Sequence, residues 1–157
     1  MFQTRRIWGV FFAAALSGLA PLPPAASVKP KVITEPTGDD ADDPAIWVHP
    51  KDPARSLVIG TNKAAAPRGA LVVFGLDGRL RQRIEPLDRP NNVDVEYGLL
   101  LAGRRTDIAV VTERYQKRLR VFRIDQQTGR LEDVSSGGGI PVFEARQGRG
   151  REPMGIG

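Results

Sequence analysis

Acidic and basic side chains recur in this sequence at a spacing that suits the binding of cations and anions. Asp42 and Asp43 precede one apolar run, and Lys63 closes the next. Further along, Asp94 precedes an apolar stretch and Arg114 closes the one after it. Carboxylates ligate hard metal ions, and lysine and arginine both bind phosphate oxygens. The repetition predicts equivalent acids and bases at equivalent places in a repeated unit.

A third pair of segments follows the same repeat. Residues 71–74, followed by Asp77-Gly78, are echoed by residues 119–122, followed by Asp125 and Gly129. A period of roughly fifty residues, with several short strands in each unit, is typical of β-propeller blades.

Short β-branched and aromatic runs separated by turn residues fill the middle of the chain. No segment after the N-terminal leader has a helical period, and Asp77-Gly78 is a strong hairpin signal. The sequence therefore predicts an all-β fold, an antiparallel meander of about two propeller blades. Strands are expected at 45–48, 57–61, 70–74, 79–84, 92–97, 106–112, 118–124 and 130–134.

The segments on either side of these strands lack periodicity. Residues 28–41 predict an extended lead-in, and the glycine-rich chain beyond Ser135 predicts loops. Two blades do not close a propeller ring. We therefore expect residues 28–157 to be the N-terminal part of a longer, here incomplete, propeller domain.

The N-terminus has the features of a secretory signal peptide. Arg5-Arg6 supplies a positive region, residues 7–19 are apolar, and Ala25-Ala26-Ser27 offers small residues for cleavage. The apolar stretch is shorter than the roughly twenty residues that a transmembrane helix needs. We expect residues 1–27 to be removed and the mature protein to be secreted or periplasmic without a membrane anchor. A short anchor is the alternative.

Composition excludes several classes of phosphatase and partner. The chain has no cysteine, which excludes a disulfide framework and a thiolate phosphatase. The one histidine, His49, lacks a preceding arginine and is expected to be a turn residue rather than a phosphohistidine nucleophile. The net charge of +5 is dispersed over the chain. Dispersed charge and export argue against nucleic acid and favour a small anionic substrate.

Four motifs in this order resemble the N-terminal part of the β-propeller phytases. They are residues 42–50 (DDPAIWVHP), 61–63 (TNK), 91–94 (NNVD) and 113–114 (ER). The resemblance runs from about Glu35 to Gly155. It implies a secreted, six-bladed, calcium-dependent enzyme, a 3-phytase-like phosphatase that removes phosphate from phytate (myo-inositol hexakisphosphate) or other inositol phosphates.

The same resemblance assigns roles to individual residues. It implies that Asp42, Asp43 and the backbone carbonyl of Val93 hold Ca²⁺. It also implies that Lys63 and Arg114 grip substrate phosphate and stabilise its charge while a metal-activated water attacks. Taken without the resemblance, the acids also suit a solvated turn and the bases suit ordinary surface charges.

Two residues depart from the family pattern, Met154 and also Ile33, which stands about two residues before Glu35, where some members have a further acidic ligand. Met154 stands where the family has a tyrosine that helps to bind phosphate, and a thioether donates no hydrogen bond.

Two other functions remain open. One is a truncated, non-catalytic propeller fragment that binds calcium or phosphate. The other is a different calcium-dependent propeller hydrolase of the lactonase or esterase type, which the paired bases disfavour because a neutral ester does not require them. In the leading hypothesis the activity belongs to the complete propeller, and this chain alone is not assigned it.

The export hypothesis predicts one cleavage position. We expect a signal peptidase to cut after Ala26 or Ser27, because small residues follow the apolar core there. N-terminal sequencing of the exported protein checks this, and a mature chain that begins at Met1 contradicts it.

Overall fold

The computed structural model describes residues 27–143 and 152–156. The predicted signal peptide, apart from Ser27, lies outside the described residues. The described residues contain no α-helix, only two short 3₁₀ turns, η1 (Pro53–Arg55) and η2 (Ser136–Gly138). None of their helices is long and apolar enough to cross a membrane. The strands are β1 (Ala41–Trp47), β2 (Leu57–Asn62), β3 (Gly69–Gly75), β4 (Leu80–Leu87), β5 (Pro90–Leu101), β6 (Arg104–Glu113), β7 (Arg118–Ile124), β8 (Leu131–Asp133) and β9 (Ile140–Pro141).

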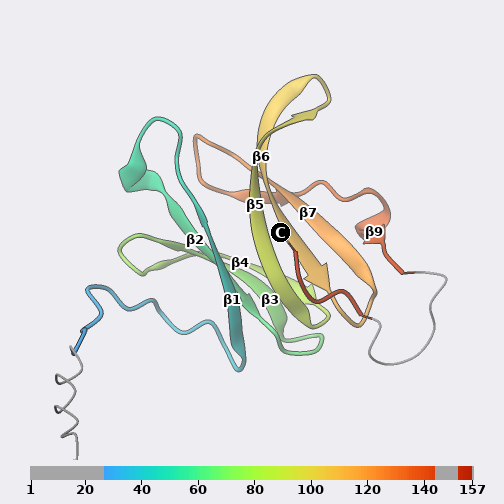
Figure 1. Ribbon diagram of the computed structural model, residues 1–157, viewed down its shortest axis with the longest axis horizontal. Coiled ribbons are helices and arrows are strands. Elements are labelled where there is room, and N and C mark those ends of the chain that lie inside the picture. The colour runs from blue at the N-terminus through green and yellow to red at the C-terminus, as the bar shows by residue number, and fades with distance from the viewer. Residues whose placement is uncertain (1–26, 144–151, 157) are drawn as a thin grey trace, which may run out of the picture.

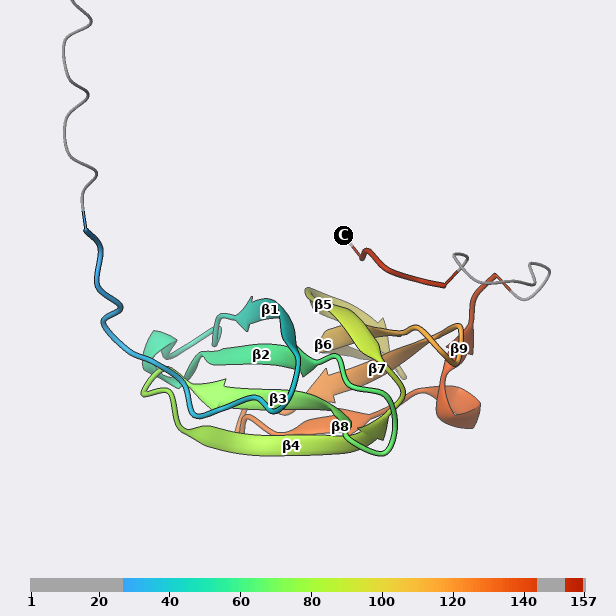
Figure 2. The same ribbon diagram turned by 90° about the horizontal axis from the view of Figure 1, so that it is seen from below.

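These strands form two antiparallel sheets in chain order (Figure 1). The first sheet is β1-β2-β3-β4, and the second is β5-β6-β7-β8, with β9 paired to β7 beyond the end of β8. The prediction of an all-β antiparallel meander is confirmed. Seen from below, the sheets stand beside one another, with β1 next to β5 and with β4 and β8 at the opposite edge (Figure 2).

Two segments differ from the sequence prediction. The chain beyond Ser135 was expected to be loops. Instead, Ile140 of β9 pairs with Leu119 of β7. Strand β9 is too short to leave a periodic signal in the sequence. The β5–β6 hairpin is also longer than expected. Ala102 and Gly103 both have positive φ, 47° and 77°, which is the conformation of a tight two-residue hairpin turn.

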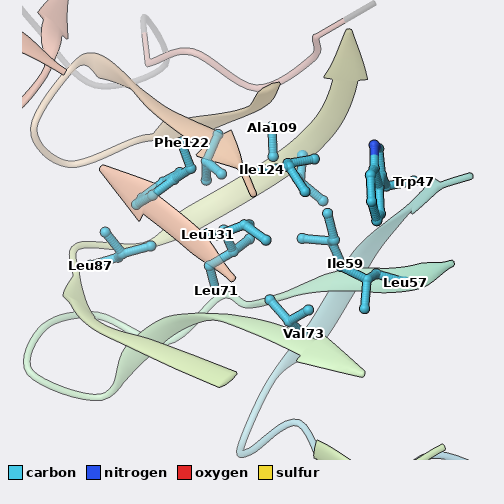
Figure 3. Packing of buried hydrophobic residues seen from close by; sticks show 12 residues of the cluster. Trp47, Leu57, Ile59, Leu71, Val73, Leu87, Ala109, Phe122, Ile124 and Leu131 are labelled. Carbon is cyan, nitrogen blue, oxygen red and sulfur yellow. The ribbon is translucent and has the colours of Figure 1, made fainter. Parts of the chain in front are cut away.

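The main core lies between the two sheets, where their facing side chains meet (Figure 3). Alternation along each strand sends every second residue to this layer, as Leu57 and Ile59 of β2 illustrate. The one polar atom of Trp47 is satisfied across the layer, because Nε1 donates to Asp107 Oδ2 at 3.0 Å. The buried members are Trp47, Leu57, Ile59, Leu71, Val73, Leu87, Val93, Ala109, Val111, Phe122, Ile124 and Leu131.

The lead-in segment covers the other face of the first sheet. Glu35 N donates to the carbonyl of Gly78 at 2.9 Å, and Arg83 Nη1 donates to the carbonyl of Thr37 at 2.7 Å. Arg83 lies opposite Val72 in the β3–β4 register, so the lead-in crosses the face to which Val72 points. The segment is extended, as predicted, and attached to the sheet.

The buried layer predicts unequal costs for two isoleucine truncations. Ile59 is fully buried between the sheets, whereas Ile46 is 60% exposed. We expect Ile59→Ala to lower the free energy of unfolding by about 2–5 kcal/mol. The control, Ile46→Ala, should change it by no more than about 0.5 kcal/mol. Urea unfolding of the two variants measures the difference, and equal losses would contradict this placement of the core.

Candidate functional site

The first strands of the two sheets begin with the same irregularity. In the β1–β2 ladder the register shifts between Ala41 and Pro44. In the β5–β6 ladder it shifts between Pro90 and Val93. The residues inside the first bulge are the predicted metal ligands Asp42 and Asp43.

The second bulge holds Asn91 and Asn92, and this corrects the sequence analysis. Asp94 was expected to be the counterpart of the acidic pair, but it lies beyond the bulge. Its side chain is exposed, and Oδ1 accepts from the neighbouring Val95 N at 2.8 Å. Two amides therefore replace the two carboxylates at the equivalent place.

Buried threonine hydroxyls fix both bulges in the same way. Thr61 Oγ1 accepts a hydrogen bond from Asp43 N at 3.1 Å, and Thr112 Oγ1 accepts one from Asn92 N at 3.0 Å. The Thr61 hydroxyl also donates to the carbonyl of Asn91 at 3.1 Å, which ties the first sheet to the second. A hydroxyl that both donates and accepts satisfies backbone groups that a bulge removes from the ladder.

A base follows each second strand and contacts the bulge of its own sheet. Lys63 Nζ lies 2.5 Å from Asp42 Oδ1. Arg114 Nη1 lies 3.5 Å from Asn91 Oδ1, and its Nη2 lies 3.1 Å from Glu152 Oε2. The structure thus brings each predicted base to the same relative position, with a carboxylate beside the lysine and an amide beside the arginine.

Asp43 and Val93, both predicted to hold a metal ion, contact each other across the sheets. Val93 N donates to Asp43 Oδ2 at 2.9 Å. The N–H and C=O of one strand residue point to the same side of the strand. The Val93 carbonyl is therefore directed away from β6, towards the side on which Asp43 lies.

These donors fit part of a calcium site. Asp42 Oδ2, Asp43 Oδ1 and the Val93 carbonyl are oxygens of the kind that Ca²⁺ prefers. They are fewer than the six to eight oxygens of a usual calcium shell. No group of three or more His, Cys, Asp or Glu side chains within residues 27–143 and 152–156 is placed to hold a metal ion. A complete shell therefore needs ligands from outside these residues.

The guanidinium of Arg114 has one unsatisfied atom. Its Nε is buried and has no hydrogen-bond partner in the described part of the chain. A buried donor left unpaired costs roughly 1–3 kcal/mol. The terminal nitrogens of Arg114 are held by Asn91 and Glu152, while its Nε is shielded from solvent by the described residues.

A polar residue just before each base holds the adjoining loop, and the sequence analysis gave neither one a role. Asn62 Oδ1 accepts from Asp40 N at 2.9 Å, and Glu113 Oε1 accepts from Asp88 N at 2.7 Å. Asn62 is the last residue of β2, and Glu113 is the last residue of β6. This shared position in the repeat is the sequence signal that could have identified both residues.

Glu113 is also the centre of a charged cluster. Its carboxylate is almost fully buried, with Oε2 2.5 Å from Arg118 Nε and 3.5 Å from Arg120 Nη1. The hydrogen bond to Glu113 raises the pKa of Arg118, which desolvation alone would lower. Burial would raise the pKa of Asp133, but hydrogen bonds from Arg120 and Ser135 hold it below its ordinary value. Arg118 and Asp133 are thus held in their charged forms.

The C-terminal segment reaches the site through its backbone. The carbonyl of Met154 accepts from Asn91 Nδ2 at 3.2 Å, while the Met154 side chain is half exposed. Glu152, from the same segment, pairs with Arg114. The family resemblance already places an acid at Glu152, but sequence reasoning gave it no role and did not find its pairing with Arg114.

Comparison with known proteins identifies the family that this chain resembles. A family model described as Phytase matches residues 17–144. The 3-phytase of Bacillus subtilis (strain 168) is 41% identical over 102 residues, which cover 63% of this chain and 25% of the relative. The chain spans about a quarter of the length of that curated relative.

The buried cluster predicts a large stability cost for one carboxylate. Glu113→Ala leaves the partly exposed Arg118 without its carboxylate and releases the amide of Asp88, so unfolding should become easier by roughly 1.5–3 kcal/mol. The matched control is Glu132→Ala, whose pair with Arg123 is half exposed and should contribute at most about 1 kcal/mol. Thermal or urea unfolding measures the stability of both variants. Similar losses of unfolding free energy would contradict a stabilising role for the Glu113 cluster.

Proposed function

Because the chain belongs to the phytase family, we propose that it forms the phosphate-binding part, and a share of the calcium site, of an enzyme that hydrolyses phytate or related inositol phosphates. The observation that carries the proposal is the placement of Lys63 and Arg114 at equivalent strand ends, each beside the bulge of its own sheet. Two bases from two neighbouring repeats give one phosphate group donors on more than one side.

The two sheets are, in this proposal, two neighbouring blades of a six-bladed propeller. Their strands follow one another in chain order, and their first strands carry the same bulge and lie side by side (Figure 1). Packing of facing sheet surfaces around a shared core is what adjacent blades require. Equivalent loops of successive blades then gather at one end of the ring.

Lys63 and Arg114 would bind phosphate in different ways. Lysine offers a compact charge, whereas arginine offers a planar set of donors whose orientation is fixed. Asn91 and Glu152 contact the terminal nitrogens of Arg114 and so fix the orientation of its guanidinium. As the phosphoryl group transfers, both bases would stabilise the charge on its oxygens.

Asp42, Asp43 and the Val93 carbonyl would hold calcium together with ligands from outside the described residues. Calcium bound there supplies charge neutralisation and an activated water for hydrolysis. When Asp42 ligates a cation, its carboxylate no longer needs Lys63 as counter-ion, and the lysine becomes available to a phosphate oxygen. The Asp42–Lys63 pair therefore couples cation binding to phosphate binding.

Export and an alternative complete the proposal. Secretion or periplasmic location follows from the signal-like residues 1–27.

The incomplete donor set favours one second candidate, a non-catalytic module that binds calcium or phosphate. Phosphate release from phytate distinguishes the two, because only the enzyme produces inorganic phosphate. A lactonase or esterase would instead hydrolyse neutral esters.

Four alanine variants test the assignments in the full-length protein. Asp43→Ala should abolish calcium-dependent phosphate release, because it removes both a ligand and the bond to Val93. Lys63→Ala and Arg114→Ala should each slow turnover by an amount that corresponds to roughly 1.5–3 kcal/mol, the value of a hydrogen bond to a charged group. Asp94→Ala is the control and should leave release unchanged, since Asp94 lies outside the bulge. Normal release by the Asp43 variant would refute the metal assignment.

A further inference from the structure

We propose that the tip of the β5–β6 hairpin, residues 97–106, is a contact site for an anionic lipid surface. This contact does not depend on the proposed hydrolysis, because the tip lies at the other end of the sheets from Lys63 and Arg114. Strand β6 begins at Arg104, in the tip, and ends at Glu113, directly before Arg114. A protein held by the tip therefore keeps its candidate site turned towards the solution.

The tip projects beyond the rest of the described chain. Figure 1 shows the hairpin reaching past the neighbouring loops at that end of the sheets. A Cβ atom built on Gly103, in the turn of the hairpin, would meet no heavy atom beyond the adjoining residues within 4 Å. The tip can thus approach a flat surface without obstruction from the described residues.

Leucine side chains on the tip are exposed to solvent. Leu100 is 70% exposed, Leu99 is 41% exposed, and Leu101 is partly exposed. Strand alternation sends Leu100 to the face opposite Leu99 and Leu101, so both faces of the hairpin are apolar. Neither hydrophobic cluster of the described residues includes a residue of the tip. Single exposed leucines are ordinary, but a run of three on a projecting turn marks a contact surface.

The same tip carries an unbalanced positive charge. Residues 97–106 contain Arg104 and Arg105 and no acid. The strand register places Arg105 opposite Leu100 and Arg104 opposite Leu101. Neither arginine forms an ion pair within residues 27–143 and 152–156. Each of these two leucines therefore has a cationic neighbour across the hairpin.

Leucines flanked by arginines suit the boundary between lipid headgroups and acyl chains. The leucines would enter the apolar layer, while each arginine lays its aliphatic stem along them and keeps its guanidinium among the headgroups. One arginine near an anionic surface strengthens binding roughly fivefold. A second copy of the chain is disfavoured as the occupant, because two tips of like charge repel. The contact is reversible surface binding and differs from the membrane anchor that the sequence argues against.

The base of the hairpin is fixed to the core, which holds the tip in one direction. Asp107 Oδ1 accepts from Gly98 N at 3.0 Å, and Asp107 Oδ2 accepts from Trp47 Nε1 at 3.0 Å. The hydroxyl of Tyr97 accepts from Val48 N at 2.9 Å. A surface element that is already held in place loses less conformational freedom on binding.

Co-sedimentation of the full-length mature protein with lipid vesicles tests the contact. The vesicles are an equal mixture of phosphatidylglycerol and phosphatidylcholine, or phosphatidylcholine alone, at low salt and at about 1 M salt. Leu100→Ser and Arg105→Ser change the tip. Their matched controls are Ile140→Ser, at a half-exposed residue of β9, and Arg68→Ser, at an exposed residue that follows β2. Thermal unfolding checks that each variant is folded.

We expect the wild type to bind the anionic vesicles and not the neutral ones, and about 1 M salt to remove most of the binding. Leu100→Ser should weaken binding about tenfold, and Arg105→Ser about fivefold. Each control should change it by less than about twofold. Equal binding to both kinds of vesicle, or tip variants that bind as their controls do, would contradict the lipid contact.

Sedimentation velocity without lipid identifies the alternative occupant. A wild type that dimerises through the tip, with Leu100→Ser monomeric and neither protein bound to vesicles, would show that the leucines cover a second copy and that the lipid contact is wrong. A wild type that binds no vesicles as a monomer would also overturn it. A monomeric wild type that binds anionic vesicles through Leu100 and Arg105 supports it.

Discussion

The geometry of the whole site depends on the way two buried threonine hydroxyls hold the bulges of β1 and β5. A bulge leaves backbone groups outside the ladder, and a buried N–H without a partner is costly. Thr61 and Thr112 satisfy those groups, and Thr61 also bonds the carbonyl of Asn91 in the other sheet. These few main-chain hydrogen bonds therefore fix the positions of the polar side chains in the two bulges.

In this arrangement the same carboxylates have a structural role and a proposed role in ligand binding. Asp43 joins the sheets through Val93 N, yet it is also the residue best placed to hold a cation. Asp42 balances Lys63, yet each of them is suited to a ligand of its own. Within the described residues, the protein contacts Asp42 through Oδ1 and Asp43 through Oδ2, so in our proposal the other oxygen of each carboxylate would ligate the cation.

Much of the fold was predictable from sequence, because the signal is local. Alternating apolar residues placed eight strands, and the turn Asp77-Gly78 marked a hairpin that is present. The counterpart of the acidic pair was misplaced because Asp94 matches it in residue type, whereas equivalence is set by strand register. Only pairing with Thr112 identifies Asn92 as the counterpart of Asp43. The pairing of Glu152 with Arg114 was not predicted, because it is a contact between distant segments that residue spacing does not encode.

Because two amides replace two carboxylates, the bulge of β5 is neutral where the bulge of β1 is negatively charged. On the side of the first sheet, Asp42 and Asp43 outweigh Lys63, whereas on the other side Asn91 and Asn92 are neutral and Arg114 is paired with Glu152. If the proposed function holds, an anion that approaches this edge would be repelled by the acids of the first sheet until a cation binds there. The charge distribution would then favour binding of the metal ion before the anion.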